Sequence, residues 1–158
     1  MYGVGPLYVG GIAVITLAAV LLRNRGVFAS GRLERLRTVF AVPGIVCIVG
    51  GIVLWIYAAA LSGIDDGIRE NRLVTGGAYA LVRNPIYSAA MILCTGVILF
   101  VGNAWFFALP PLYWLVMTVL MKGTEEKWLR ELYGREYDDY CARVNRCWPW
   151  FPRGAKGK

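Results

Sequence analysis

Two short polar segments of the chain contain the side chains best suited to chemistry. The first, residues 71–87, ends in Arg83-Asn-Pro-Ile-Tyr87 and leads into a long apolar stretch. Asn84 is a good N-cap and Pro85 a good first helical residue, so we expect a helix to begin here with free backbone N–H groups at its positive dipole end. Arg83 adds a fixed cation suited to a carboxylate. The segment therefore predicts an anion-binding site.

The same segment has further features that would help to hold a ligand. Gly76 and Gly77 let the backbone turn sharply or approach a ligand closely. Tyr79 and Tyr87 supply aromatic faces. The simpler interpretation is a capped helix start with a snorkelling Arg83 and interfacial tyrosines, as many membrane-spanning helices have.

The second polar segment, residues 124–144, contains the adjacent carboxylates Glu125 and Glu126. Its apolar residues recur at helical spacing, and Glu126 and Arg130 are spaced as an i, i+4 ion pair, so we expect an amphipathic helix. The carboxylates could line a pocket for a zwitterionic or cationic ligand. Alternatively, they occupy the first turn of a helix capped by Thr124, where the dipole favours acids.

Composition limits the chemistry that these segments can perform. The chain has no histidine, which excludes imidazole bases, Ser-His-Asp and Cys-His catalysis, and nearly all mixed histidine zinc sites. Its four cysteines form no CxxC pair, so we expect reduced, buried thiols and no metal site. Chemistry must therefore use carboxylates, arginine, lysine, tyrosine and thiols.

The elements that must position these segments are membrane helices. Hydrophobic residues make up 58% of the 158 residues and charged ones 17%, with a mean hydropathy of +0.53. We expect a single all-α, polytopic membrane domain over residues 1–158, with two N-terminal spans in 1–61. Four uncharged stretches predict four transmembrane helices, at residues 4–22, 40–60, 86–101 and 104–121. Only Gly102 and Asn103 separate the last two, which predicts a tight hairpin.

Because both arms of this hairpin start and finish on one side, both polar segments must share a compartment. That side carries 12 of the 17 basic residues, which places it, and the active site, in the cytoplasm. Five arginines between the first two spans oppose this rule. Residues 31–40 could form an interfacial amphipathic helix, or the first span could be something other than a simple crossing. In a chain this apolar, the net charge of +7 indicates contact with membrane lipids and no nucleic-acid partner.

The order and spacing of several motifs resemble the isoprenylcysteine carboxyl methyltransferase and phospholipid methyltransferase superfamily, integral-membrane enzymes that use S-adenosylmethionine. The resemblance covers residues 71–152 and implies that they form a methyltransferase-like core. The matching motifs are Leu73-Val-Thr-Gly-Gly-Ala-Tyr79, Arg83-Asn-Pro-Ile-Tyr87, Glu125-Glu126, Tyr133-Gly-Arg-Glu-Tyr137 and Tyr140-Cys-Ala-Arg-Val144. It implies that S-adenosyl-L-methionine is the cofactor. The residues that it assigns to cofactor contacts are Asn71, Arg72, Leu73, Val74, Tyr79, Asn84, Pro85 and Tyr87.

The chain departs from that superfamily at three positions. Asn84 stands where histidine is usual, and Ala78 where proline is frequent. A substrate-binding arginine of the prenylcysteine enzymes is matched by Met121, with Lys122 beside it. Asparagine can still cap a helix and donate a hydrogen bond, so the pattern preserves cofactor binding. The missing arginine weakens the case for a prenylcysteine carboxylate as substrate.

The resemblance predicts methyl transfer to a lipophilic or lipid-linked acceptor that enters from the bilayer. We expect Arg83, Glu125 and Glu126 to act in catalysis, and Lys122, Glu125 and Arg143 to bind substrate. A glutamate would take the proton of an amine or thiol acceptor, whereas a basic side chain would orient a carboxylate. Prenylcysteine, phospholipid amine and isoprenoid acceptors all stay open, as do an NADPH-dependent membrane reductase and a non-enzymatic membrane subunit.

Overall fold

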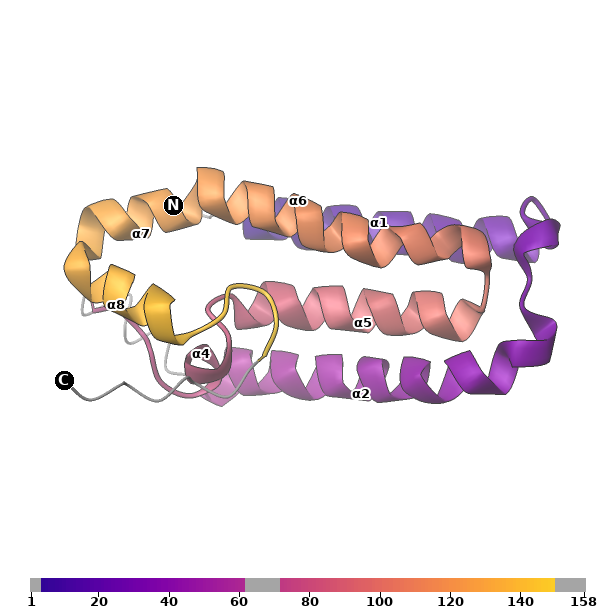
Figure 1. Ribbon diagram of the computed structural model, residues 1–158, viewed down its shortest axis with the longest axis horizontal. Helices are drawn as coiled ribbons and strands as arrows, with labels where there is room; N and C mark the ends of the chain where they lie inside the picture. The colour runs from indigo at the N-terminus through magenta and orange to yellow at the C-terminus, as the bar shows by residue number, and fades with distance from the viewer. Residues whose placement is uncertain (1–3, 62–71, 150–158) are drawn as a thin grey trace.

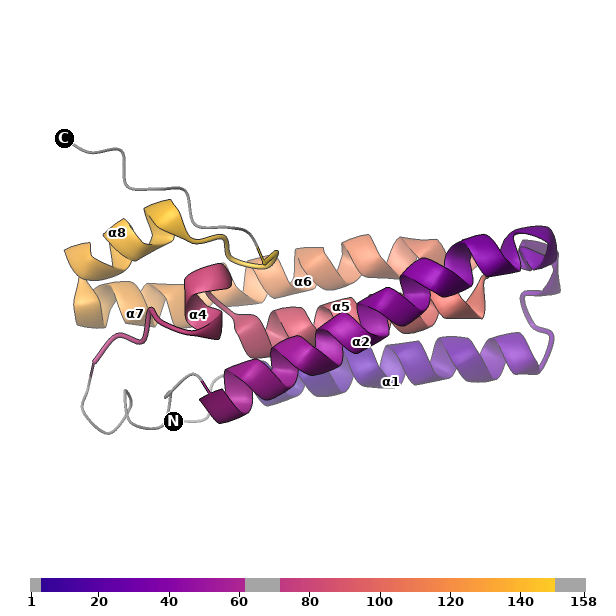
Figure 2. The ribbon, with the colours of Figure 1, turned by 90° about the horizontal axis from the view of Figure 1, so that it is seen from below.

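The computed structural model describes residues 4–61 and 72–149, and every regular element within them is helical. Four long helices lie side by side along the long axis of the molecule (Figure 1). They are α1 (Gly5–Asn24), α2 (Arg37–Leu61), α5 (Pro85–Val101) and α6 (Leu109–Gly123). Helix α5 contacts the other three, and most extensively α2, which crosses it obliquely (Figure 2). The all-α prediction is confirmed for the described residues.

Three segments are long and apolar enough to cross a membrane: Gly5–Asn24, Glu34–Ala60 and Ala104–Tyr133. They match the first, second and fourth of the predicted spans. The third is the apolar helix α5, which has 17 residues, slightly fewer than the roughly 20 of a typical span. A crossing by α5, and with it the four-span topology, stays a prediction.

Small residues let α2 and α5 pack closely. A Cβ atom added to Gly96 of α5 would lie 2.6 Å from the carbonyl oxygen of Gly44 in α2. One added to Gly51 would lie 2.9 Å from the carbonyl oxygen of Ala89. Backbone contact through small residues is a common way to associate helices in lipid, where no hydrophobic effect drives the helices together.

The chain reverses direction between α5 and α6 at the predicted two residues. Gly102 ends α5 in the left-handed conformation, with φ +63°. Asn103 follows, and its Oδ1 accepts a hydrogen bond from the Trp105 N–H at 3.1 Å. A 3₁₀-helix, η3 (Ala104–Ala108), precedes α6. The α-helix begins only at Leu109, because Pro110 next to it favours a helix start.

Two sequence predictions about surface helices are wrong in detail. Residues 31–40 do not form a separate amphipathic helix, because the 3₁₀-helix η2 (Glu34–Leu36) leads directly into α2. The segment after α6 forms two helices instead of one, α7 (Glu125–Tyr133) and α8 (Arg135–Arg143). Gly134 separates them with φ +52°, a conformation that ends an α-helix at little cost only for glycine.

The two views place α7, α8 and the short helix α4 (Ala78–Leu81) at one end of the bundle (Figures 1 and 2). The buried side chains of α8, Tyr137 and Tyr140, pack against Leu73 in the segment before α4. Both predicted polar segments therefore meet at this end of the molecule.

Candidate functional site

A buried ion-pair cluster joins the two polar segments. Glu126, in the first turn of α7, lies between the guanidinium groups of Arg83 and Arg146. Its Oε1 is 3.2 Å from Nη2 of Arg83 and also accepts a hydrogen bond from Nε of Arg146. Its Oε2 accepts a second bond from Nη2 of Arg146 at 2.8 Å. The side chains of Glu126 and Arg83 are only 6% and 8% exposed, so these charges are held away from water.

Two backbone contacts hold the cluster in place. The Arg83 N–H donates to the carbonyl oxygen of Asn145 at 2.8 Å. The side-chain Nδ2 of Asn84 donates to the carbonyl oxygen of Arg146 at 3.1 Å. Asn84 occupies the N-cap position and Pro85 the first turn of α5, as predicted. However, the Asn84 side chain makes no capping bond to the helix, because its amide instead holds the segment that carries Arg146.

The cluster contains two guanidinium groups and one carboxylate, so it keeps a formal charge of +1. The hydrogen bond to Glu126 raises the pKa of Arg146, which stays charged. Arg83 also donates to the Sγ atom of Cys141, yet its buried Nε has no hydrogen-bond partner among the described residues. An anion such as a carboxylate would satisfy both the surplus charge and the unpaired donor.

The neighbouring Glu125 has a different environment. Its Oε1 accepts a hydrogen bond from the Tyr87 hydroxyl at 2.9 Å. The Tyr87 ring packs edge-on against Tyr8, with the ring centroids 6.3 Å apart. Gly5 lies so close that an added Cβ would be 2.2 Å from the Tyr87 hydroxyl oxygen. The start of α1 therefore packs directly onto the site.

Helix α8 fixes the loop that carries the first motif. Gly77, with φ +59°, provides the predicted sharp turn and precedes α4. The hydroxyl of Tyr140 donates to the carbonyl oxygen of Tyr79 at 2.6 Å. Burial raises the pKa of Tyr140, so this hydroxyl stays protonated and able to donate. This hydrogen bond from α8 thus positions the backbone of Tyr79, and with it the Tyr79 side chain.

A model of the phospholipid methyltransferase family matches residues 39–136, which is more than half of the chain. The chain belongs to this family. The family is part of the isoprenylcysteine carboxyl methyltransferase-like superfamily, so the resemblance seen in the motifs is confirmed. Membership makes the chain a membrane methyltransferase. A search of curated proteins and a search of solved structures each found no match.

The matched region of the methyltransferase includes most of the predicted site residues, and the fold brings many of them together. Arg83 and Glu126 are in contact, as are Tyr87 and Glu125. Asn84 and the buried Pro85 follow Arg83 at the start of α5, and Leu73 packs against Tyr137 and Tyr140 of α8. Val74 and Tyr79 are half-buried. Asn71 lies outside the described residues.

Three predicted residues lie on the exposed surface of the methyltransferase. Lys122, in the last turn of α6, and Arg72, before α4, are both exposed. Arg143 is also exposed, and its Nε donates to the carbonyl oxygen of Asp139 in its own helix at 3.2 Å. The substrate-binding roles of Lys122 and Arg143 therefore stay predictions without a contact to the cluster.

Two predictions about polar side chains at the start of and within α7 are wrong: the cap by Thr124 and the ion pair between Glu126 and Arg130. Thr124 does not cap this helix, because its hydroxyl donates backwards to the carbonyl oxygen of Leu120 at 2.6 Å. Arg130 contacts Asp138 of α8 at 2.7 Å, whereas Glu126 is occupied by the two arginines of the cluster. Spacing along one helix was a poor guide here because α8 folds back onto α7.

The sequence analysis missed Arg146 and Tyr8. Arg146 is one of nine basic residues after residue 121, and nothing in its local pattern distinguishes it. Tyr8 belongs to the first apolar stretch, far from either motif. Both lie outside the residues that the family model matches, so only the folded structure connects them to the site.

Proposed function

We propose that the chain transfers the methyl group of S-adenosyl-L-methionine to a lipophilic acceptor that enters from the bilayer. The observation that carries this proposal is the buried cluster of Arg83, Glu126 and Arg146, with its surplus positive charge and the unpaired Nε of Arg83. Phospholipid methyltransferase family membership supplies the reaction class.

The residues present fit the amino-acid part of this cofactor. Its carboxylate would be bound by Arg83, where the positive charge and the buried Nε need an anion. Tyr79, Asn84 and Tyr87 would line the same site from the loop and the start of α5. Asn71, Arg72, Leu73, Val74 and Pro85 belong to the proposed cofactor contacts by family resemblance. The cofactor supplies an electrophilic methyl group on a positively charged sulfur.

The two adjacent glutamates have different proposed roles. Glu126 is held by two arginines, so it orients them and is poorly placed to take up a proton. Glu125 is half-buried and, among the described residues, accepts a hydrogen bond from Tyr87 alone. An amine or thiol acceptor must lose a proton, and Glu125 is the group best placed to receive it. Most of the rate enhancement would come from holding donor and acceptor in line, which can supply about 7 to 11 kcal/mol.

The surroundings of Met121 favour an acceptor without a carboxylate. This residue replaces the arginine that the resemblance expects for a prenylcysteine substrate. It is fully buried in an apolar cluster with Met117, Tyr113 and Cys147. Because methionine replaces arginine at this position, we propose an amine-bearing or neutral lipid over a prenylcysteine carboxylate as acceptor.

Cofactor binding by the purified full-length protein in detergent tests the proposal. We expect S-adenosylhomocysteine, but not NADPH, to raise the melting temperature. The substitution Arg83→Lys keeps a charge beside Glu126 but removes the Nε donor, so it should weaken binding at least tenfold by calorimetry. Arg135→Lys, on the exposed start of α8, is the matched control and should bind as the wild type does.

Two results would contradict the assignment of the cofactor and its site. Stabilisation by NADPH alone would favour a reductase, and unchanged affinity in Arg83→Lys would remove the assigned anion site. If Arg83→Lys fails to fold, Tyr87→Phe serves as the second variant. It removes only one hydroxyl of a residue that would line the same site, so the fold should tolerate it. Membranes incubated with methyl-labelled cofactor should then yield labelled lipid; label confined to protein would exclude a lipid acceptor.

A further inference from the structure

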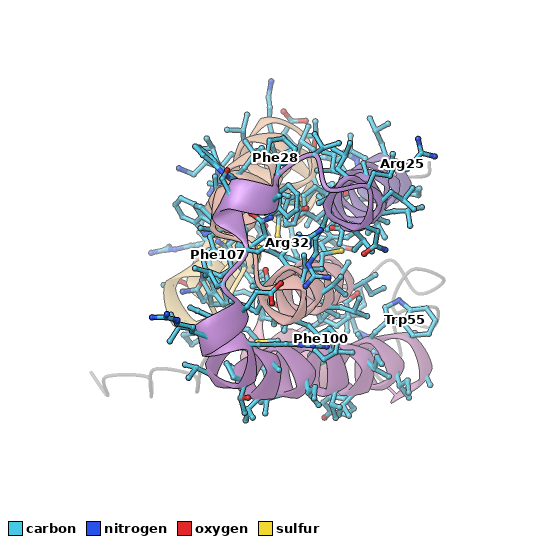
Figure 3. The ribbon with its side chains drawn as sticks, turned by 90° about the vertical axis from the view of Figure 1, so that its right-hand side faces the viewer. Arg25, Phe28, Arg32, Trp55, Phe100 and Phe107 are labelled. Carbon is cyan, nitrogen blue, oxygen red and sulfur yellow. The ribbon has the colours of Figure 1, made fainter. Side chains whose placement is uncertain are left out.

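A second charged surface lies at the end of the bundle opposite the site. The arginine loop, residues 23–37, joins α1 to α2, and its only acidic residue is Glu34. Its five basic residues are Arg23, Arg25, Arg32, Arg35 and Arg37. All of them except Arg23 are exposed. In Figure 3, which faces this end, Arg25 projects outward past α1. The loop therefore presents a strongly positive surface with little neutralisation of its own.

The loop is fixed firmly to the turn between α5 and α6. Asn103 of that turn is fully buried, and its Nδ2 donates to the carbonyl oxygen of Phe28 at 2.9 Å. The Leu33 N–H donates to the carbonyl oxygen of Gly102 at 3.0 Å. The Phe28 ring packs edge-on against Phe106, with centroids 5.3 Å apart. These contacts hold the arginines at one end of the bundle.

Two polar features of the loop would be stabilised by an anion. The Nε of Arg23 is buried and has no hydrogen-bond partner among the described residues. Arg37 is the first residue of α2, directly after η2, which contains Arg35. Cations are unfavourable at a helix N-terminus, where the backbone N–H groups already create positive potential. An anion placed there would be attracted by the helix end and by the arginines together.

The side chains around the arginines fit a membrane surface. Trp105 is 62% exposed, and Val27 and Leu36 are exposed as well. Tryptophan is enriched where the hydrocarbon core meets the headgroups. Apolar side chains beside basic ones suit that boundary, since the former enter the acyl region and the latter meet phosphate. These neighbours favour the phosphate of a lipid headgroup as the anion for this surface.

We propose that the arginine loop binds the phosphates of anionic phospholipids, in the leaflet opposite the methyltransferase site. A zwitterionic lipid would not neutralise the surplus of arginine over Glu34, whereas an anionic one would. Arginine also bonds phosphate oxygens in a bidentate manner. This binding accounts for the arginines that oppose the positive-inside rule, and it is independent of the proposed methyl transfer.

Lipid retention by the full-length protein tests the proposal. The protein is exchanged into micelles that contain equal amounts of phosphatidylglycerol and phosphatidylcholine, and retained lipids are counted by native mass spectrometry. We expect a several-fold preference for phosphatidylglycerol. The double variant Arg25→Gln/Arg35→Gln should reduce this preference at least threefold. Lys127→Gln/Arg135→Gln removes the same charge from exposed positions of α7 and α8, and should keep it.

Each other outcome would overturn the proposal. Equal retention of both lipids by the wild type would show no anionic preference. An equal loss in the two double variants would indicate a general effect of net charge. Displacement of the lipid by millimolar inorganic phosphate would indicate a site for free anions. Unchanged melting temperatures in phosphatidylcholine micelles establish that the variants fold. If Arg25→Gln/Arg35→Gln does not fold, the single variant Arg25→Gln is used in its place.

Discussion

The two ends of the bundle both have more basic than acidic residues but use their arginines in different ways. The arginine loop contains five basic residues and one acidic residue, and the described residues after α2 contain eight and six. At the site, Glu126 is buried between Arg83 and Arg146. At the loop, none of the ion pairs among the described residues involves an arginine of the loop. Burial requires that charges be paired, whereas an exposed surface leaves them available to an external partner.

The largest expected effect comes from breaking the buried cluster. Glu126→Ala leaves two buried guanidinium groups without their carboxylate, which should lower the free energy of unfolding by about 3 kcal/mol or more. Reversible unfolding in mixed micelles measures this change. Glu131→Ala, an exposed carboxylate of the same helix, is the control and should have little effect. Equal stability of the two variants would show that the buried pairing of Glu126 does not stabilise the fold, and the contrast between paired arginines at the site and unpaired ones at the loop would be lost.

The next largest effect on the free energy of unfolding is expected from removing the side chain that holds the arginine loop in place. Asn103→Ala leaves the Phe28 carbonyl and the Trp105 N–H without their partner and should cost about 1 to 3 kcal/mol. Because this turn lies at the opposite end of the bundle, the affinity for S-adenosylhomocysteine should be unchanged. Asn24→Ala, at the exposed end of α1, is the control. A parallel loss of cofactor affinity would show that the two ends are coupled.

A smaller effect is expected at Glu125. Tyr87→Phe removes one hydroxyl and its bond to the carboxylate, so unfolding free energy should fall by about 1 kcal/mol. Turnover should fall further than stability if Glu125 receives the acceptor's proton. The measurement is initial rate at saturating cofactor, alongside unfolding. Tyr133→Phe on α7 provides a matched control, and an identical rate in both variants would argue against the role of Glu125.

The smallest effect is expected at the exposed arginines. Arg25→Gln/Arg35→Gln should change the free energy of unfolding by less than about 0.5 kcal/mol in zwitterionic micelles, because both side chains are exposed and neither pairs with a carboxylate of the described residues. The same unfolding assay measures it. A loss comparable to that of Glu126→Ala would mean that the loop arginines stabilise the fold itself.

Features set by local chemistry were predictable. The reversal at Gly102 and Asn103, the start of α5 at Pro85 and the turn at Gly77 all follow from the conformational limits of glycine and proline. The pairing partners were not predictable in this way. The Thr124 hydroxyl donates to the carbonyl oxygen of Leu120, one turn earlier. Arg130 pairs with Asp138 because the turn at Gly134 brings α8 against α7.

The sequence by itself determined an all-helical chain with two polar segments on one side of an apolar hairpin, because hydrophobicity is a property of the linear chain. Its motifs carried the resemblance to membrane methyltransferases. Only the tertiary structure decided which charges are neutralised. Glu126 meets Arg146, 20 residues away, and Asn103 holds Phe28, 75 residues away. A buried charge takes whichever partner the packing of the helices brings to it, and that choice is made by contacts distant in sequence.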